Sequence, residues 1–189
     1  MNSKTKKIVG IGLFTAIVVV LQLLGGGIRI GTMFSISLVL VPIVVGAAVY
    51  GWQAGAWLGF MFGAAVLLSG DAAAFLAVDP LATVLVVLVK GTACGLVSGL
   101  IYTGLKRYNT FLAVVATAIA CPLTNTGIFL LGCQLFFLET ITEWAVGAGF
   151  PSAGNYMIFG LAGINFLIEL AVNILLAPVI TRLITYAKK

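Results

Sequence analysis

The sequence contains no histidine, few charged residues and only three cysteines. Charged residues make up 8% of its 189 residues, against about 25% in an ordinary soluble domain. A soluble protein with so few charges cannot cover its surface with polar groups, so the composition excludes that class. The absence of histidine removes the commonest general base and metal ligand. The cysteines match no zinc-binding spacing and are expected to be small packing residues within apolar runs: Cys94, Cys121 and Cys133.

Motifs for nucleotide hydrolysis and covalent catalysis are also missing. The sequence has no phosphate-binding loop, no serine nucleophile elbow and no cluster of acidic metal ligands. We therefore expect that the chain is not an enzyme, holds no cofactor or metal and does not hydrolyse ATP. Its two halves show no internal repeat of the kind found in many secondary transporters, which argues against alternating access by this chain alone.

Long apolar runs dominate what is present, with 62% hydrophobic residues. A helix that spans a membrane needs about 20 mainly apolar residues. The runs predict an all-α protein with a single domain, residues 1–189, built as a bundle of six transmembrane helices. We expect these helices at about 8–24, 35–50, 52–69, 80–105, 110–138 and 156–186.

If the chain has six transmembrane helices, most of the basic residues fall on one side of the membrane. Both termini then share one side with the short turn at 106–109. That side carries eight of the ten basic residues: Lys4, Lys6, Lys7, Lys106, Arg107, Arg182, Lys188 and Lys189. Because basic residues are enriched in cytoplasmic connections, both termini are predicted to be cytoplasmic. The longer connections, at 25–34, 70–79 and 139–155, then face outward, which favours the capture of a ligand from outside.

Several polar residues lie inside the predicted helices. Ionisable residues within the membrane are costly, so each is a functional hypothesis. Lys90 and Glu169 are the two charged residues predicted to lie within the membrane, and Asn125 reaches a similar depth, roughly 15–20 Å from the outer end. Asn165, Glu169 and Asn173 follow one another at intervals of four and share a helix face. One interpretation is a pocket that binds a polar ligand, and the other is a buried Lys90–Glu169 ion pair that only fixes the packing of the helices.

Two further candidates lie in the first outward connection. Arg29 is the only basic residue predicted on the outer side, where it would attract an anionic group of a ligand or contact a lipid headgroup. Phe34 would supply an apolar wall to the pocket or anchor the chain at the membrane interface.

Glycines recur at every fourth position in the third and fourth predicted helices. Such spacing lines one helix face with small residues and lets a neighbouring backbone approach closely. The two runs, which predict tight packing between helices, are Gly51, Gly55, Gly59 and Gly63, followed by Gly91, Gly95 and Gly99.

Some stretches resemble a known family of membrane proteins. Residues 34–47 read FSISLVLVPIVVGA, residues 50–56 read YGWQAGA, and Lys90-Gly91 and Asn125-Thr126-Gly127 follow. Together with the length and the six helices, these stretches resemble the substrate-binding S components of energy-coupling factor (ECF) transporters. The resemblance implies a multi-pass protein of a prokaryotic plasma membrane that binds a small vitamin. It also implies partners, namely a transmembrane scaffold subunit and two cytoplasmic ATPases that hydrolyse the ATP.

The resemblance also suggests a docking surface and a ligand. The family docks through an Ala-xxx-Ala pair on the first helix, and the matching positions here are Gly12 and Ala16, followed by the bulkier Val20. Pantothenate is the preferred ligand, because a carboxylate with hydroxyl and amide groups suits Lys90, Arg29 and the asparagines; riboflavin comes next. The alternatives are a small ion-coupled carrier or channel that uses a Lys90–Glu169 pair, or a structural subunit without a ligand.

Overall fold

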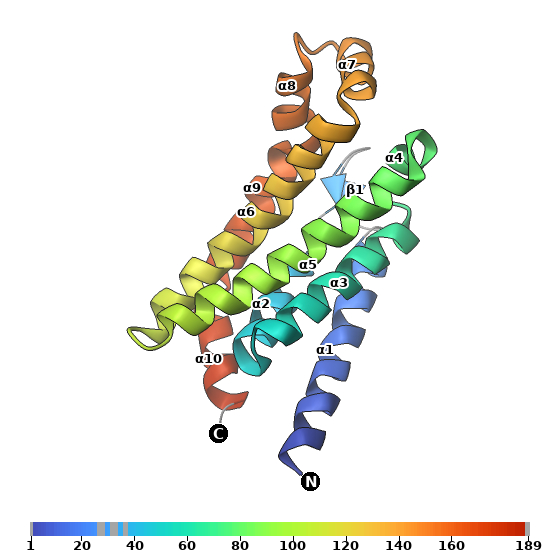
Figure 1. Ribbon diagram of the computed structural model, residues 1–189. Helices are drawn as coiled ribbons and strands as arrows, with labels where there is room; N and C mark the ends of the chain where they lie inside the picture. Colours follow the sequence, from blue (N-terminus) through green and yellow to red (C-terminus); the bar gives the residue numbers. More distant parts are fainter. Residues whose placement is uncertain (1, 26–28, 31–33, 36–37, 188–189) are drawn as a thin grey trace.

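The part of the chain that the structure describes is a bundle of helices with one short pair of antiparallel strands (Figure 1). The computed structural model describes residues 2–25, 29–30, 34–35 and 38–187. The prediction of an all-α fold is confirmed. The long helices are α1 (Ser3–Gly25), α3 (Trp52–Ser69), α5 (Pro80–Leu105) and α6 (Thr110–Phe136). Helices α3 and α5 have the bounds expected from the sequence, because local signals mark their ends. Asp79 caps α5 by accepting a hydrogen bond from the Ala82 amide, and Pro80 occupies the first turn.

Helix α2 (Leu40–Tyr50) is shorter than predicted and lies inside the bundle. It contacts α1, α3, α5, α6, α9 and α10, and eight of its eleven residues are buried. Residue 35, the predicted start of this helix, belongs instead to strand β2 (Phe34–Ser35), which pairs antiparallel with β1 (Arg29–Ile30). Because neighbouring helices surround α2, it can be apolar on all sides without having the length of a full span.

The two outward connections expected as loops at 70–79 and 139–155 contain short helices. These are α4 (Ala73–Val78), α7 (Leu138–Gly147) and α8 (Ala153–Asn155). Helices α4 and α7 lie at the end of the bundle opposite the two chain termini (Figure 1).

The last predicted helix, at 156–186, is divided into three segments. A π-helical segment, η1 (Tyr156–Ala162), is followed by α9 (Gly163–Leu175) and α10 (Ala177–Ala187). Gly163 joins the first two with a positive φ of 23°, which glycine adopts at little cost. The second break falls at Leu176, two residues before Pro178, whose nitrogen carries no hydrogen to continue the helical hydrogen bonding.

The glycine repeats meet where α3 crosses α5, as the sequence predicts. A Cβ atom added to Gly55 would meet the carbonyl oxygen of Gly95, and one added to Gly59 would meet that of Gly91. The two backbones are therefore in direct contact, and this contact fixes how α3 and α5 lie against each other.

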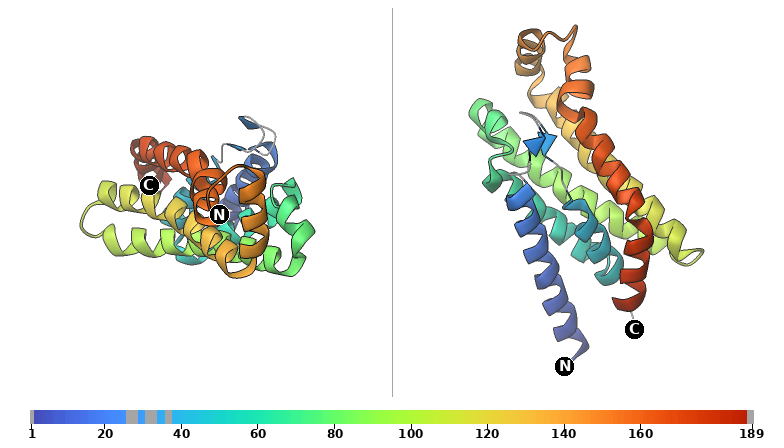
Figure 2. Two further views of the ribbon diagram at one scale, coloured as in Figure 1. Left: turned by 90° about the horizontal axis from the view of Figure 1, so that it is seen from above. Right: turned by 180° about the vertical axis from the view of Figure 1, so that it is seen from behind.

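The helices give the chain the properties of a multi-pass membrane protein. Among the described residues, five helical stretches are long and apolar enough to cross a membrane, and α2 is a shorter apolar helix. Both termini lie at the same end of the bundle (Figures 1 and 2), an arrangement compatible with six passes.

Candidate ligand-binding site

A cavity of about 520 Å³ lies toward the end of the bundle that carries α4 and α7. Side chains from α1, α3, α4, α5, α6, α7, η1 and α9 line it. Because Asp71, an exposed residue on the turn between α3 and α4, is among them, the cavity reaches the surface. Its volume falls in the range of about 300–1,000 Å³ that is typical of small-molecule sites.

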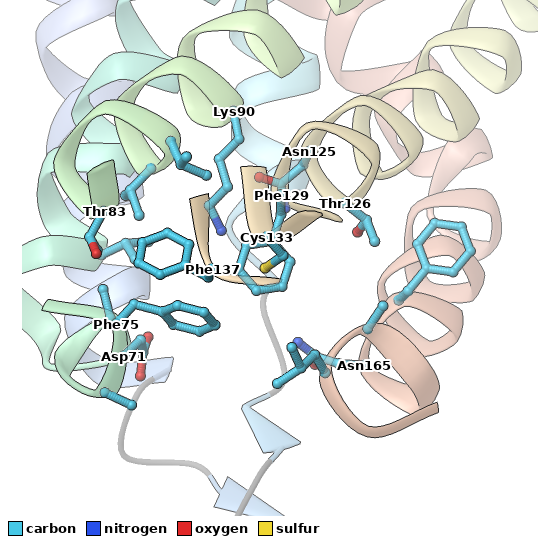
Figure 3. Close-up of a pocket in the computed structure, with 18 of the residues that line it drawn as sticks. Asp71, Phe75, Thr83, Lys90, Asn125, Thr126, Phe129, Cys133, Phe137 and Asn165 are labelled. Carbon is cyan, nitrogen blue, oxygen red and sulfur yellow. The ribbon is translucent and has the colours of Figure 1, made fainter. Parts of the chain in front are cut away.

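The side chain of Lys90 enters this cavity from α5 (Figure 3). Its amino nitrogen lies 5.1 Å from the ring centroid of Phe129 on α6 and 6.0 Å from that of Phe62 on α3. Ring faces attract a cation but satisfy none of its hydrogen bonds. The contact of Gly59 with Gly91 places Phe62 and Lys90 on the same side of the α3–α5 crossing, so the glycine packing helps to build this part of the site.

Glu169, on α9, lines the same cavity. Its carboxylate is opposite in charge to the ammonium group of Lys90. Glu169 is 6% exposed. The two side chains interact electrostatically, but they form no direct ion pair with each other. Lys90 and Glu169 therefore both remain available to a molecule in the cavity.

Asn173, four residues further along α9, is placed differently from the prediction. It is fully buried and is not among the residues that line the cavity. Its side-chain nitrogen donates a 2.8 Å hydrogen bond to the backbone carbonyl of Glu169. In this structure Asn173 supports the helix next to the site.

Two asparagines present unpaired acceptors at the cavity. The side-chain oxygens of Asn125 and Asn165 are buried and have no hydrogen-bond partner among the described residues. Asn125 lies on α6 near Lys90, and Asn165 approaches from the other side of the cavity (Figure 3). Buried polar atoms in native proteins are nearly always paired, so these oxygens indicate a molecule or water that donates hydrogen bonds.

Aromatic rings cover the cavity toward α4 and α7. Phe75 makes edge contacts with Phe129, Phe137 and Trp144, with ring centroids 5.7, 5.1 and 5.3 Å apart. All four rings line the cavity. They provide an apolar wall against which methyl groups or a ring of a ligand can pack.

The rim of the cavity contains a polar contact that was not predicted from the sequence. The side-chain nitrogen of Gln22, on α1, donates a 2.6 Å hydrogen bond to the carboxylate of Asp71, and lies 3.4 Å from the hydroxyl of Ser69. Gln22 is the only amide side chain in the apolar run 8–24. A single amide in such a run could have indicated a polar contact at this position. The contact ties the end of α1 to the turn between α3 and α4.

The remaining predicted residues lie outside the cavity or outside the described side chains. Arg29 and Phe34 belong to β1 and β2, but their side chains lie outside the described part of the structure, so their roles stay predictions. Gly12 and Ala16 are exposed on α1, and the space beside Gly12 is open.

The fold and the cavity define a multi-pass membrane protein with a small-molecule site. The family model for the substrate-specific component of ECF transporters matches residues 6–181. The chain therefore belongs to this family, whose role is transport and not catalysis, and whose members bind small vitamins and associate with the subunits of an ECF module.

Two relatives extend the comparison. The chain is 26% identical over 208 residues to the pantothenic acid transporter PanT of Lactococcus lactis subsp. cremoris (strain MG1363), with 99% of this chain and 97% of PanT covered. The solved structure of ThiT from Listeria monocytogenes shares the fold, with a TM-score of 0.68 and 19% identity over 98% of this chain and 96% of ThiT.

Proposed function

We propose that this protein captures pantothenate from outside the cell and passes it to an ECF module whose ATPase subunits drive import. The observation that carries the proposal is the cavity itself. In the described part of the chain, Lys90 forms no ion pair with a carboxylate, and the same cavity is lined by the unpaired side-chain oxygens of Asn125 and Asn165. The likeness to PanT along nearly its whole length supports the same ligand.

The chemistry of pantothenate matches the lining of the cavity group by group. Its carboxylate suits the ammonium group of Lys90. Its amide and its two hydroxyl groups can donate hydrogen bonds to Asn125 and Asn165. Its two methyl groups suit the aromatic wall around Phe75. Riboflavin, the second candidate, would use the same rings for stacking but brings no carboxylate for Lys90.

The proposed orientation in the membrane follows from the charges. With six passes and both termini in the cytoplasm, eight of the ten basic residues lie on the inner side. The end of the bundle with α4 and α7 then faces outward, so the cavity is open to the external solution. The membrane is the plasma membrane of a prokaryote, and this chain itself needs no cofactor.

Fluorescence of the purified protein in detergent tests the binding. Trp144 lines the cavity, whereas Trp52 lies on α3 with 45% of its surface exposed. We expect pantothenate to change the tryptophan emission with nanomolar affinity, and Trp144→Phe to remove most of that change. Trp52→Phe is the matched control and should keep it.

Calorimetry and mass spectrometry of the co-purified ligand complete this test. Binding of riboflavin in preference to pantothenate would contradict the assigned ligand. Substrate flux into liposomes without partner subunits or ATP would instead favour the stand-alone carrier.

The proposed docking surface is the exposed face of α1 that carries Gly12 and Ala16. Only 11% of the apolar window in α1 is buried, the smallest share among the five candidate spans, which leaves this helix available to a partner. Gly12→Leu or Ala16→Leu is expected to reduce uptake by the complete transporter at least about tenfold, because a large side chain prevents close approach of a partner helix. Pantothenate affinity of the isolated subunit should stay unchanged.

Gly12→Ala is the control for this surface, since it keeps a small side chain and should preserve uptake. A loss of ligand affinity in Gly12→Leu, or normal uptake by both leucine variants, would contradict the docking assignment.

A further inference from the structure

The carboxylate of Glu169 is nearly buried, and no residue that the structure describes donates a hydrogen bond to it. It is 6% exposed, and it accepts no hydrogen bond from any residue in the described part of the chain. Asn173 donates to the backbone carbonyl of Glu169 and so does not satisfy the carboxylate. Burial of an ionised group without partners is unfavourable, so an acid in this position responds strongly to any charge that enters the cavity.

The charged groups that share the cavity with Glu169 are few. Lys90 on α5 is the opposite charge that interacts with Glu169. Asp71, on the turn after α3, adds a negative charge at the rim of the cavity and accepts a hydrogen bond from Gln22. The other titratable groups on the surrounding elements are thiols and phenols, which are normally uncharged near neutral pH, apart from Arg182 outside the cavity. On α2, α5, α6, η1 and α10 these groups are Cys94 and Tyr102 on α5, Cys121 and Cys133 on α6, Tyr156 on η1, Tyr50 on α2, and Arg182 and Tyr186 on α10.

We propose that the ligand binds together with one proton, which Glu169 takes up. The inference rests on the proposed function, in which the ligand brings a carboxylate to Lys90. In the empty cavity the charges of Lys90 and Glu169 offset each other. A ligand carboxylate places a second negative charge beside the same ammonium group, where little water is available to screen it.

Protonation of Glu169 resolves this conflict. An ionised Glu169, one proton from the external solution and the anionic ligand give a neutral carboxylic acid next to the bound anion, so charge and atoms balance. The acid also becomes a hydrogen-bond donor, and its O–H group can donate to the ligand. Two roles thus fall to different residues: Lys90 holds the anion and Glu169 adjusts the charge of the site.

Calorimetry in buffers with different ionisation enthalpies measures the protons taken up on binding. We expect uptake to approach one proton per pantothenate at the alkaline end of a series from about pH 5 to pH 9. There the dissociation constant should rise about tenfold per pH unit. Glu169→Gln, which resembles the protonated acid in shape, should still bind pantothenate but take up no proton and show a nearly flat pH profile.

Two controls locate the proton. Asp71→Asn should keep the proton uptake, and pantothenol, which has a hydroxyl group in place of the carboxylate, should bind the wild-type protein without it. Uptake that survives in Glu169→Gln, or disappears in Asp71→Asn, would overturn the inference. Wild-type protein that binds pantothenate without proton uptake contradicts this inference alone, whereas failure to bind pantothenate at any pH contradicts the proposed function and the inference with it.

Discussion

Replacement of Gly95 by leucine is expected to prevent the protein from folding. A Cβ atom at this position meets the backbone carbonyl of Gly55, and a backbone group cannot rotate away as a side chain can. Over-packing of a well-packed core by small groups costs about 1–3 kcal/mol, and four additional carbons at a backbone contact should exceed that range. The helices α3 and α5 would have to separate, and with them Phe62 and Lys90.

Gly104→Leu is the matched control for this prediction. Gly104 lies on the same helix, and the space beside it is open. In detergent, Gly104→Leu should elute as a single peak in size-exclusion chromatography and melt near the wild-type temperature. Gly95→Leu should aggregate or melt at least about 10 °C lower, as expected for a loss of several kcal/mol. Equal melting temperatures for the two variants would show that the glycine contact does not hold α3 against α5.

Replacement of Lys90 by methionine is expected to weaken pantothenate binding by about 30- to 1,000-fold. Removal of one partner of a buried charge pair typically costs about 2–4 kcal/mol of binding free energy, which corresponds to that loss of affinity. Methionine has nearly the same length as lysine and can keep the contacts with Phe62 and Phe129. The variant should therefore fold, with a melting temperature equal to or above that of the wild type, since a partly desolvated charge has been removed.

Lys106→Met removes the same charge from the exposed turn between α5 and α6 and should bind pantothenate normally. Isothermal titration of both variants, together with their melting curves, separates binding from stability. A Lys90→Met protein that binds within about threefold of the wild type would place the ligand carboxylate elsewhere. A Lys90→Met protein that does not fold would instead support the interpretation that Lys90 and Glu169 stabilise the bundle.

The parts of the fold that local signals determine could be predicted from the sequence. Helix α5 starts where Asp79 caps it, and α3 ends at Ser69, directly before Gly70, which has a φ of 86°. The glycine spacing predicted the close contact between these two helices. The α1–α2 connection and the last helix were predicted less well. A short apolar run does not show whether a helix spans the membrane or lies inside the bundle, and the apolar run at 156–186 does not show that its first turns, η1, are π-helical.

Some residues of the candidate site could also be predicted from the sequence, and others could not. Lys90, Asn125 and Glu169 were found because polar side chains are exceptional in apolar helices. Phe62 and Phe129 were missed as partners of Lys90, because phenylalanines are common in such helices and only the crossing of α3, α5 and α6 brings these two together. Asn173 has the same spacing from Glu169 as Asn165. It lies about 6 Å farther along the helix axis, which takes it out of the cavity and into the packed interior.

The sequence alone determined that the protein is a helical membrane protein, because apolar content, charge sorting and intramembrane polar residues are properties of composition and spacing; its assignment to a transporter family came from the resemblance and the matching family model. Only the tertiary structure decided that Lys90 lies over two aromatic rings and that no direct ion pair joins it to Glu169. It also decided that the side-chain oxygens of Asn125 and Asn165 at the cavity, like that of Asn173 beside it, have no hydrogen-bond partner among the described residues. The physical reason is that helix periodicity determines which face a residue occupies. The distance between faces depends on how closely the backbones approach, and in this protein contacts such as that of Gly59 with Gly91 set that approach.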